Sequence, residues 1–282
     1  MKTDQDFFKA IDPIIEAGLR EDIHTGDITT DLLIPADNQN TAIMIAKAEG
    51  IIAGLPVAEL VFKKLDPSIQ FNIHINDGEK VKKGDLICTI SGTYRALLTG
   101  ERLALNFLQR MSGIATETAK YVEEVKDFKT EILDTRKTVP GLRFLDKYAV
   151  KAGGGTNHRI GLYDMVLIKD NHISVAGGIT NAVNAIRPKL PSNMKIEVET
   201  TTLNEVQEAL NVGADIIMLD NMDNATITAA VKLIDGKAKV EASGNMTLER
   251  VREVAATGVD YISIGALTHS VIALDISQKI KE

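Results

Sequence analysis

The second half of the chain alternates short apolar runs with stretches of helical periodicity. Six such runs occur after residue 130, at 131–135, 164–169, 195–199, 215–220, 239–243 and 261–265. They are apolar enough to be buried on both faces, which is typical of strands in a parallel sheet. Units that alternate in this way predict a parallel sheet with helical crossovers, and no dinucleotide-binding glycine fingerprint follows the first run. The pattern therefore favours a β/α barrel of about six strands over an open doubly wound sheet.

The first half of the chain has a different pattern. Apolar residues at spacings of three and four predict a helix over 4–20, and 41–98 is rich in strand signals, with strict alternation at 71–75. A long helical stretch follows at 97–125, and Ser112-Gly113 is expected to interrupt it. We predict an α/β protein with an N-terminal α/β-sandwich domain at 1–113 and an incomplete β/α barrel at 114–267. The tail, 268–282, is expected to pack on the first domain.

Composition narrows the class of protein. With 282 residues, 44% hydrophobic and 25% charged, the chain resembles a soluble globular protein. A single cysteine, Cys88 in an apolar run, excludes an internal disulfide and a cysteine-rich zinc site. Net charge −7 and 4% aromatics argue against a nucleic-acid surface. No run is long enough to span a bilayer and the first residues lack a signal-peptide core, so we expect a cytoplasmic protein.

Basic residues gather between 134 and 172 although the chain is acidic overall, which predicts a local site for an anionic ligand. Arg143, Lys147 and Lys151 fall at helical spacing and are interpreted as solvated helix charges. A functional role is predicted for the other five, which are Arg136, Lys137, His158, Arg159 and Lys169.

Residues at the ends of the six apolar runs support this interpretation. In β/α barrels the working residues lie at the C-terminal rim and come from several strands. Cations follow the first two runs, carboxylates the next two and small residues the last two. In chain order they are Thr135, Arg136, Lys137, Lys169, Glu199, Asp220, Ser243, Gly244 and Gly265. Such residues can simply terminate strands, but this division by charge across six consecutive strands favours a binding site.

Each part of the rim suits a different chemical group. The arginines can grip carboxylates through two hydrogen bonds each. Glu199 and Asp220 suit either Mg²⁺ or the hydroxyls of a sugar. Small residues in the last two βα loops let backbone N–H groups approach a phosphate, although plain turns are the alternative. These residues are Ser243, Gly244 and Asn245 in one loop and Ser263, Ile264 and Gly265 in the other.

The motifs in the second half resemble, in order and spacing, those of the quinolinate phosphoribosyltransferases, also called nicotinate-nucleotide pyrophosphorylases. They are DTRKTVPGLR, GGGTNHR, VLIKDNH, EVE, IMLDN, EASGN and ISIGALTHS. EDIHTGDITT and GERLALNFLQRMSGIAT match the N-terminal part of that family, so the resemblance covers essentially the whole chain. One position departs from the pattern: the family commonly has a glycine where this chain has Asn245, and asparagine also adopts left-handed backbone angles.

The resemblance implies that the protein joins quinolinate to phosphoribosyl pyrophosphate, releasing pyrophosphate and CO₂ and leaving nicotinate mononucleotide, in de novo NAD biosynthesis. It implies a homodimer in which Arg102 reaches the neighbouring subunit's site. The five cations, with Thr135, would hold the dicarboxylate and diphosphate, while Glu199 and Asp220 would hold the ribose and Mg²⁺. Ser243–Asn245 and Ser263–Gly265 would cradle the phosphate. Loss of pyrophosphate passes through an oxocarbenium-like state, so catalysis depends on charge placement. The catalytic residues expected are Lys137, Lys169, Glu199 and Asp220, and Lys137 or Lys169 would assist decarboxylation.

Two other functions remain open at this point. A homologue associated with molybdenum transport shares the fold, but the intact set of quinolinate-binding cations counts against it. The N-terminal β-rich region, including the turn at 76–84, resembles carrier-domain hairpins, which would make the chain a carrier or interaction module. Its lysines lack the flanking residues of a modifiable lysine, so this function is disfavoured.

Overall fold

The computed structural model describes residues 4–281, which form two compact units. Within these residues, the first unit comprises 4–119, 138–154 and 267–281, and the second comprises 120–137 and 155–266. Residues 138–154, which the predicted domain boundaries include in the barrel domain, group with the first unit by their contacts. None of the described helices combines the length and the apolar character needed to cross a membrane.

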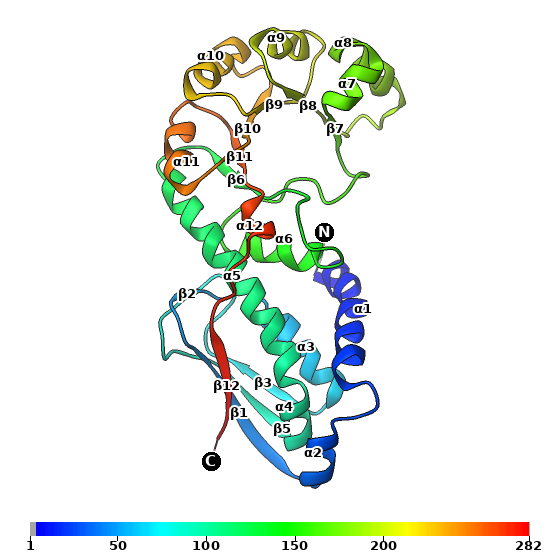
Figure 1. Cartoon of the computed structure of the whole chain (residues 1–282), viewed down its shortest axis with the longest axis vertical. Coiled ribbons are helices and arrows are strands. Elements are labelled where there is room, and N and C mark those ends of the chain that lie inside the picture. The colour runs from blue at the N-terminus through cyan, green and yellow to red at the C-terminus, as the bar shows by residue number, and fades with distance from the viewer. Residues whose placement is uncertain (1–3, 282) are drawn as a thin grey trace. The chain divides into compact units, whose positions relative to one another are not determined.

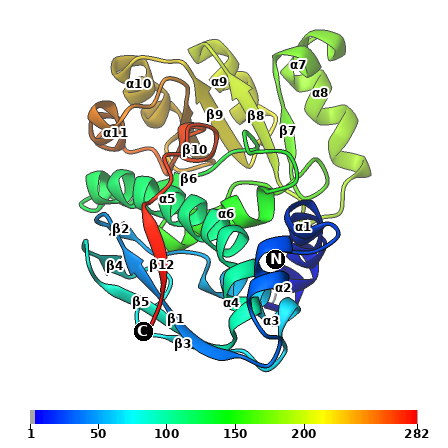
Figure 2. The same ribbon diagram turned by 60° about the horizontal axis from the view of Figure 1, so that its bottom comes forward.

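An antiparallel sheet of four strands organises the first unit, in the order β12–β1–β5–β3 (Figure 2). The strands are β1 (Gln39–Ala46), β3 (Gln70–Ile73), β5 (Leu86–Thr93) and β12 (Ile276–Ile280), and a separate two-stranded ribbon joins β2 (Gly50–Ile51) to β4 (Lys80–Val81). Ala42, Met44 and Ala46 of β1 are fully buried, as expected for one face of a strand. The C-terminal tail supplies β12, which pairs with β1 and places Ala42 opposite Ile280.

Helices complete the first unit. They are α1 (Asp4–Ile23), α2 (Ile28–Leu33), α3 (Leu55–Leu65), α4 (Tyr94–Thr99), α6 (Arg143–Ala152) and α5 (Glu101–Val125), whose last residues, 120–125, belong to the second unit. Helix α4 packs on β1 and β5. The side chain of Gln109 in α5 donates to the carbonyl oxygen of Ile276 at 2.7 Å, which ties this helix to the C-terminal strand. Cys88 is fully buried in β5, and burial raises the pKa of its thiol to about 12, so it is an unreactive core residue.

Helix α5 continues through Ser112 and Gly113, so the interruption expected there is wrong. The hydroxyl of Ser112 is buried and accepts the backbone N–H of Ala53 at 3.0 Å. A Cβ atom at residue 113 would lie 2.2 Å from the carbonyl oxygen of Ile272. These two small residues therefore let neighbouring backbone approach the helix closely, and they do not end it.

Six parallel strands form the sheet of the second unit, in the order β6–β11–β10–β9–β8–β7 (Figure 1). They are β6 (Glu131–Leu133), β7 (Val166–Ile168), β8 (Ile196–Thr200), β9 (Ile216–Asp220), β10 (Lys239–Ser243) and β11 (Tyr261–Ser263). Five of them fall within a predicted apolar run, and β8 extends one residue beyond the run 195–199. Within the described residues β6 and β7 do not pair with each other. The prediction of an incomplete six-stranded β/α barrel is therefore confirmed.

Helices cross between these strands and lie on the outer side of the sheet (Figure 1). They are α7 (Asp170–Ala176), α8 (Ile179–Ile186) with a short 3₁₀ turn at Arg187–Lys189, α9 (Leu203–Asn211), α10 (Asn224–Ile234) and α11 (Leu248–Ala255), followed by the short α12 (Ala266–His269). The side chains of Thr202 and Asp223 cap α9 and α10 by accepting backbone N–H groups of the first turn. The parallel strands and their helical crossovers leave the carboxyl ends of the strands at one edge.

Helix α6 contains charged residues in the protein interior. The interpretation of Lys147 as a solvated helix charge is wrong, because its side chain is fully buried, whereas Lys151 is exposed. Asp146 is also fully buried and accepts two hydrogen bonds from Arg110 in α5, at 3.0 and 2.9 Å. Burial raises the pKa of Asp146, and the Arg110 guanidinium opposes that shift. The pair is therefore an internal ion pair of the first unit.

We expect Arg110→Met to lower the free energy of unfolding by roughly 3–5 kcal/mol, because it leaves a buried carboxylate without its cation. Lys63→Met is the matched control, since it removes an exposed ion pair to Glu59 on the same unit and should cost less than about 0.5 kcal/mol. Urea denaturation followed by circular dichroism measures both. Equal losses in the two variants would show that the Arg110–Asp146 pair has no special role in stability.

Candidate active site at the rim of the six-stranded sheet

The carboxyl ends of the six parallel strands carry the residues that the sequence predicts for the site. Because the strands are parallel and adjacent, their carboxyl ends meet at one edge. Asp220 at the end of β9 lies directly opposite Ser243 at the end of β10, and Glu199 lies near the end of the neighbouring strand β8. Thr135, Arg136 and Lys137 follow β6, Lys169 follows β7 and Ser263 ends β11. The structure therefore brings the predicted strand-end residues of the second unit to one rim.

Two arginines form the most strongly cationic part of this rim. Burial lowers the pKa of Arg159, and the nearby positive charge of Arg136 lowers it further. The Nε atom of Arg136 is buried and has no hydrogen-bond partner among residues 4–281. Two neighbouring guanidinium groups with an unused buried donor are suited to bind an anion that bridges them.

Lys169 and Glu199 form an ion pair across β7 and β8. The Nζ atom of Lys169 lies 2.8 Å from a carboxylate oxygen of Glu199, and their side chains are 46% and 14% exposed. The ring of His172 accepts the backbone N–H of Lys169 at 3.0 Å, so this histidine caps α7. The Lys169 ammonium is therefore half-exposed, whereas the Glu199 carboxylate is largely enclosed.

Asp220 belongs to a chain of amide hydrogen bonds between two strand ends. The amide nitrogen of Asn221 donates to the carboxylate of Asp220 at 2.8 Å, and its amide oxygen accepts from the side chain of Asn245 at 3.1 Å. Asn245 has φ = +50°, so the backbone conformation expected of asparagine at this position is present. The β9 and β10 loops are thus fixed to each other through side-chain amides.

The guanidinium of Arg250 in α11 holds the same loops through their backbone carbonyl groups. It donates to the carbonyl oxygen of Gly244 at 3.2 Å and to that of Met222 at 2.7 Å. With these carbonyl groups held, the loop 243–245 is a small, ordered turn at the start of a helix, as a phosphate site requires.

The last βα loop is arranged differently from the prediction. The backbone N–H of Ile264 donates to the carbonyl oxygen of Leu133 at 2.9 Å, so it is used within the sheet. Ser263 and Ile264 are 5% and 2% exposed. Of the three residues predicted in this loop, only Gly265 is as much as partly exposed at the rim.

Comparison with known proteins agrees with this geometry. The model of the quinolinate phosphoribosyl transferase C-terminal domain matches residues 114–279, and that of the N-terminal domain matches residues 27–112. The chain is 47% identical to a probable nicotinate-nucleotide pyrophosphorylase [carboxylating] of Synechocystis sp., covering 96% of this chain and 92% of that protein. It is also 47% identical to quinolinate phosphoribosyltransferase [decarboxylating] 1b of Nicotiana tabacum, covering 95% of this chain and 81% of that protein. The chain belongs to the quinolinate phosphoribosyltransferase family.

Solved structures of quinolinate phosphoribosyltransferase family members have the same fold. NadC from Streptococcus pyogenes superposes with a TM-score of 0.94 at 42% identity, covering 97% of both chains. The nicotinate-nucleotide pyrophosphorylase from Francisella tularensis superposes with a TM-score of 0.92 at 44% identity, covering 97% of this chain and 96% of that one. The family resemblance inferred from the sequence motifs is therefore confirmed.

A buried cluster lies among the strands of this family member, and sequence reasoning found only one of its residues. The Nε2 atom of His158 is 3.0 Å from a carboxylate oxygen of Glu197 and 3.3 Å from one of Glu241. Both glutamates are fully buried, and the histidine side chain is 8% exposed. Burial raises the pKa of Glu197 to about 7, with a further contribution from Glu241. Burial lowers the pKa of His158, but the two glutamates outweigh this effect and raise it.

Asp134 is a third residue that the sequence prediction missed. Its fully buried carboxylate accepts the backbone N–H of His158 at 2.8 Å and the side chain of Asn157 at 2.7 Å. The loop 155–159 is thereby fixed to the end of β6. The signal available in the sequence was an acidic residue inside an apolar strand run, as in ILD, IEVE and KVEAS. Such residues are rarely buried without a partner and so indicate an internal polar network.

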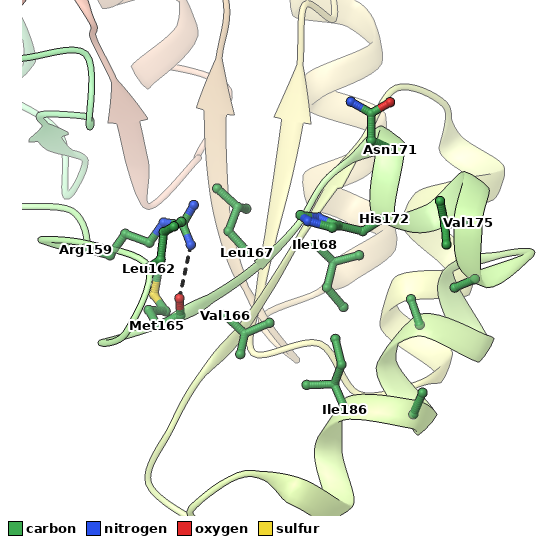
Figure 3. Close-up of a pocket in the computed structure, with 13 residues that line it drawn as sticks. Arg159, Leu162, Met165, Val166, Leu167, Ile168, Asn171, His172, Val175 and Ile186 are labelled. Carbon is green, nitrogen blue, oxygen red and sulfur yellow. Dashed lines mark hydrogen bonds between the residues drawn. The ribbon is translucent and has the colours of Figure 1, made fainter.

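A pocket of about 600 Å³ opens beside the unpaired edge strand β7 (Figure 3). Arg159 lies at one side of it and donates from Nη1 to the carbonyl oxygen of Met165 at 3.2 Å. Its remaining lining is mostly apolar and includes Leu162, Val166, Ile168, Val175 and Ile186. An apolar lining does not suit a dianion, so the rim, and not this pocket, is the candidate anion site.

Arg102 and the residues after β6 occupy more open positions. Arg102 lies in the first turn of α5, in the first unit, and its side chain is exposed. It forms no hydrogen bond or ion pair within residues 4–281. The hydroxyl of Thr135 accepts the backbone N–H of Lys137 at 3.0 Å. The side chain of Lys137 is exposed.

We expect Gly244→Ala to lower the free energy of unfolding by roughly 2–5 kcal/mol, because two costs add there. Gly244 has φ = +93°, which costs an L-residue about 1–2 kcal/mol, and a Cβ atom would lie 2.2 Å from the side-chain oxygen of Asn221. Gly213→Ala is the matched control: its φ is +76°, but nothing lies within 4 Å of an added Cβ atom. Chemical denaturation that gives the same loss for both variants would contradict the close contact with Asn221.

Proposed function

We propose that this chain is a quinolinate phosphoribosyltransferase, which transfers the phosphoribosyl group of phosphoribosyl pyrophosphate to quinolinate with decarboxylation. The products are nicotinate mononucleotide, pyrophosphate and CO₂, a step of NAD biosynthesis. The observation that carries this conclusion is the 47% identity over nearly the whole chain to relatives of that name, across both domains of the family. The rim residues described above would supply the chemistry that the reaction requires.

Quinolinate carries two carboxylates, and the cationic part of the rim is the site we assign to it. Arg136 and Arg159 would each donate hydrogen bonds to a carboxylate, with Lys137 and Lys169 adding positive charge. The buried, unpaired Nε of Arg136 and the depressed pKa of Arg159 support this assignment, since a bound dianion would relieve both. His158, which precedes Arg159 in the loop 155–159, would be part of the same site.

Phosphoribosyl pyrophosphate would occupy the other half of the rim. Ser243, Gly244 and Asn245, with Gly265, would cradle the 5′-phosphate through backbone N–H groups. The left-handed turn at 244–245, in which Gly244 is half-buried and Asn245 exposed, supports this assignment. Ser263 and Ile264 would act by shaping the loop, because their side chains are buried and the Ile264 N–H is already bonded.

Glu199 and Asp220 would hold the ribose hydroxyls and Mg²⁺. The donor set fits this ion, which usually takes one or two protein carboxylates and completes its shell with water and substrate phosphate oxygens. When bound, Mg²⁺ neutralises charge on the departing pyrophosphate. Glu199 would exchange its contact with Lys169 for the substrate, and Asn221 would keep the Asp220 carboxylate oriented through their 2.8 Å hydrogen bond.

The rim residues would act on the reaction by charge placement. Departure of pyrophosphate leaves positive charge on the ribose ring, which the carboxylates of Glu199 and Asp220 would stabilise. Loss of CO₂ from the pyridine ring leaves negative charge on carbon, which a lysine ammonium, Lys137 or Lys169, would stabilise. No covalent intermediate with the protein is needed, and the site has to exclude water because the same cationic ribose would react with it.

A homodimer with shared active sites, located in the cytoplasm, is part of this proposal. Arg102 would complete the site of the partner subunit, which is supported by its exposure and by its lack of a hydrogen bond or ion pair within residues 4–281. Leu162 and Val175, beside the unpaired edge of β7, are 75% and 91% exposed. Exposed apolar side chains next to an open sheet edge are suited to be covered by another chain.

An assay with the purified protein, quinolinate, phosphoribosyl pyrophosphate and Mg²⁺ tests the proposed function. We expect nicotinate mononucleotide to form, as detected by mass spectrometry, with one CO₂ and one pyrophosphate released per product. Nicotinate in place of quinolinate is the control for substrate choice, since it lacks the second carboxylate that the arginine pair requires. Absence of the mononucleotide with quinolinate would show that the proposed function is wrong.

A further inference from the structure

Two fully buried glutamates face one histidine ring inside the second unit, and the proposed reaction assigns no task to the glutamates. Glu197 lies in β8 and Glu241 in β10, and both are among the strands' most buried residues. Burying a carboxylate is strongly unfavourable unless a partner compensates it. Both carboxylates lie against the same Nε2 atom of His158, at 3.0 and 3.3 Å. A pair of charges kept in the interior at this cost points to a role beyond packing.

The hydrogen bonds of the His158 ring fix which nitrogen carries the proton. The backbone N–H of Arg159 donates to Nδ1 at 2.8 Å, so Nδ1 acts as an acceptor. Nε2 faces the two carboxylates and therefore carries a ring proton. The three groups have ligand atoms within 4.8 Å of one another, as a metal site would. A metal ion would need the lone pair of Nε2, however, so this arrangement favours a buried cluster in which a ring N–H faces two carboxylates.

The same histidine is held by its backbone as well as by its ring. Asp134, after β6, accepts the backbone N–H of His158 at 2.8 Å. Asp134 after β6, Glu197 in β8 and Glu241 in β10 therefore all contact His158. Arg159 follows directly and its backbone N–H donates to the His158 ring, so the position of the ring is linked to that of the Arg159 backbone.

The two glutamates are also placed to act beneath the rim. Side chains two residues apart in a strand point to the same face. Glu197 thus shares a face of β8 with Glu199, and Glu241 shares a face of β10 with Ser243. The negative charge of Glu197 is also felt by Arg159. It offsets part of the repulsion between Arg159 and Arg136 while no anion is bound.

We propose that Glu197 and Glu241 are positioning residues for the substrate anion: they hold the His158 ring and, through it, keep Arg159 beside Arg136 in the geometry that receives a carboxylate. This inference rests on the proposed function, in which that anion is quinolinate. It adds a buried layer to the site, since neither glutamate touches the substrate. Preorganised groups of this kind lower the cost of ordering a binding site.

Glu197→Gln and Glu241→Gln test the proposal, because glutamine keeps the size of the side chain and removes its charge. We expect each variant to weaken quinolinate binding 10- to 100-fold by calorimetry, while the KM for phosphoribosyl pyrophosphate changes less than threefold. Thr200→Val is the matched control. Thr200 is 1% exposed in β8 and donates to the Met218 carbonyl at 2.9 Å, so its loss should lower stability and leave quinolinate affinity unchanged. Glutamine variants that bind quinolinate like wild type, or a control that loses as much affinity, would overturn the proposal.

Nitrogen-15 NMR of the histidine rings provides a readout that does not depend on activity. We expect a proton on Nε2 of His158 in the wild-type protein and a shifted Nε2 resonance in either glutamine variant. An Nε2 without a proton, as a bound metal ion would require, overturns the proposal even if a variant fails to fold. If the wild-type protein shows the expected ring proton but does not bind quinolinate, the proposed substrate is wrong. The proposed arrangement of the buried cluster would still hold in that case.

Discussion

Replacing Arg159 by alanine is expected to weaken quinolinate binding by roughly 2–5 kcal/mol, about 30-fold to several-thousand-fold. The physical reason is the location of the guanidinium: it is partly buried, its pKa is lowered by burial and by Arg136, and a carboxylate placed between the two arginines would remove that repulsion. Arg136→Ala should have an effect of the same size, because its buried Nε offers a donor that no group in the described residues uses. Isothermal calorimetry with quinolinate measures both.

Two further variants separate charge from geometry in this prediction. Arg159→Lys keeps the charge and loses the planar fork, so it should recover only part of the lost affinity. Arg187→Ala removes an exposed arginine of the same unit, which pairs with Asp215 at 3.4 Å, and should leave quinolinate affinity unchanged. Unchanged affinity in both Arg136→Ala and Arg159→Ala would remove the arginine pair from the substrate site.

The arrangement of the second unit was accessible from the sequence because its strands are buried on both faces. Buried parallel strands leave continuous apolar runs, and all six coincide with β6 to β11. Their charged ends then identified the rim, because parallel strands deliver their carboxyl ends to one edge. The left-handed conformation of Asn245 also followed from its residue type.

Other features depend on contacts that a one-dimensional pattern does not contain. Gly113 looks like a helix breaker in the sequence, yet it allows the backbone at Ile272 to approach α5. Lys147 has the spacing of a solvated helix charge, yet it is fully buried. The N–H of Ile264 is used by Leu133, a pairing between β11 and β6 that joins residues 131 positions apart.

The buried acids of the site were hidden for a related reason. Glu197 and Glu241 are separated by 44 positions and meet only because β8 and β10 flank β9 in the sheet. The sequence shows two acidic residues within apolar strands but not that they share one histidine. Local patterns therefore located the residues that contact the ligand in our proposal, whereas the residues that orient them required the fold.

Mixing two inactive variants is expected to restore about a quarter of wild-type activity if Arg102 acts across a dimer. Arg102 is exposed in the first turn of α5, where the helix dipole favours negative charge, so its position there costs stability and calls for a function. Arg102→Ala and Arg136→Ala should each be nearly inactive alone. After co-refolding, random pairing gives about half heterodimers, and each holds one intact and one doubly altered site.

The matched control for this experiment is a mixture of Arg136→Ala and Arg159→Ala. Both changes lie on the rim of the same unit, so every heterodimer has two damaged sites and no activity should return. Native mass spectrometry of differentially tagged chains establishes that heterodimers form in both mixtures. Recovery in the first mixture alone supports shared sites. If each site were built from one chain, every site in that mixture would carry one of the two substitutions and no activity would return. If heterodimers form and the first mixture stays as inactive as its parents, Arg102 does not complete the partner's site, and each site is built from one chain.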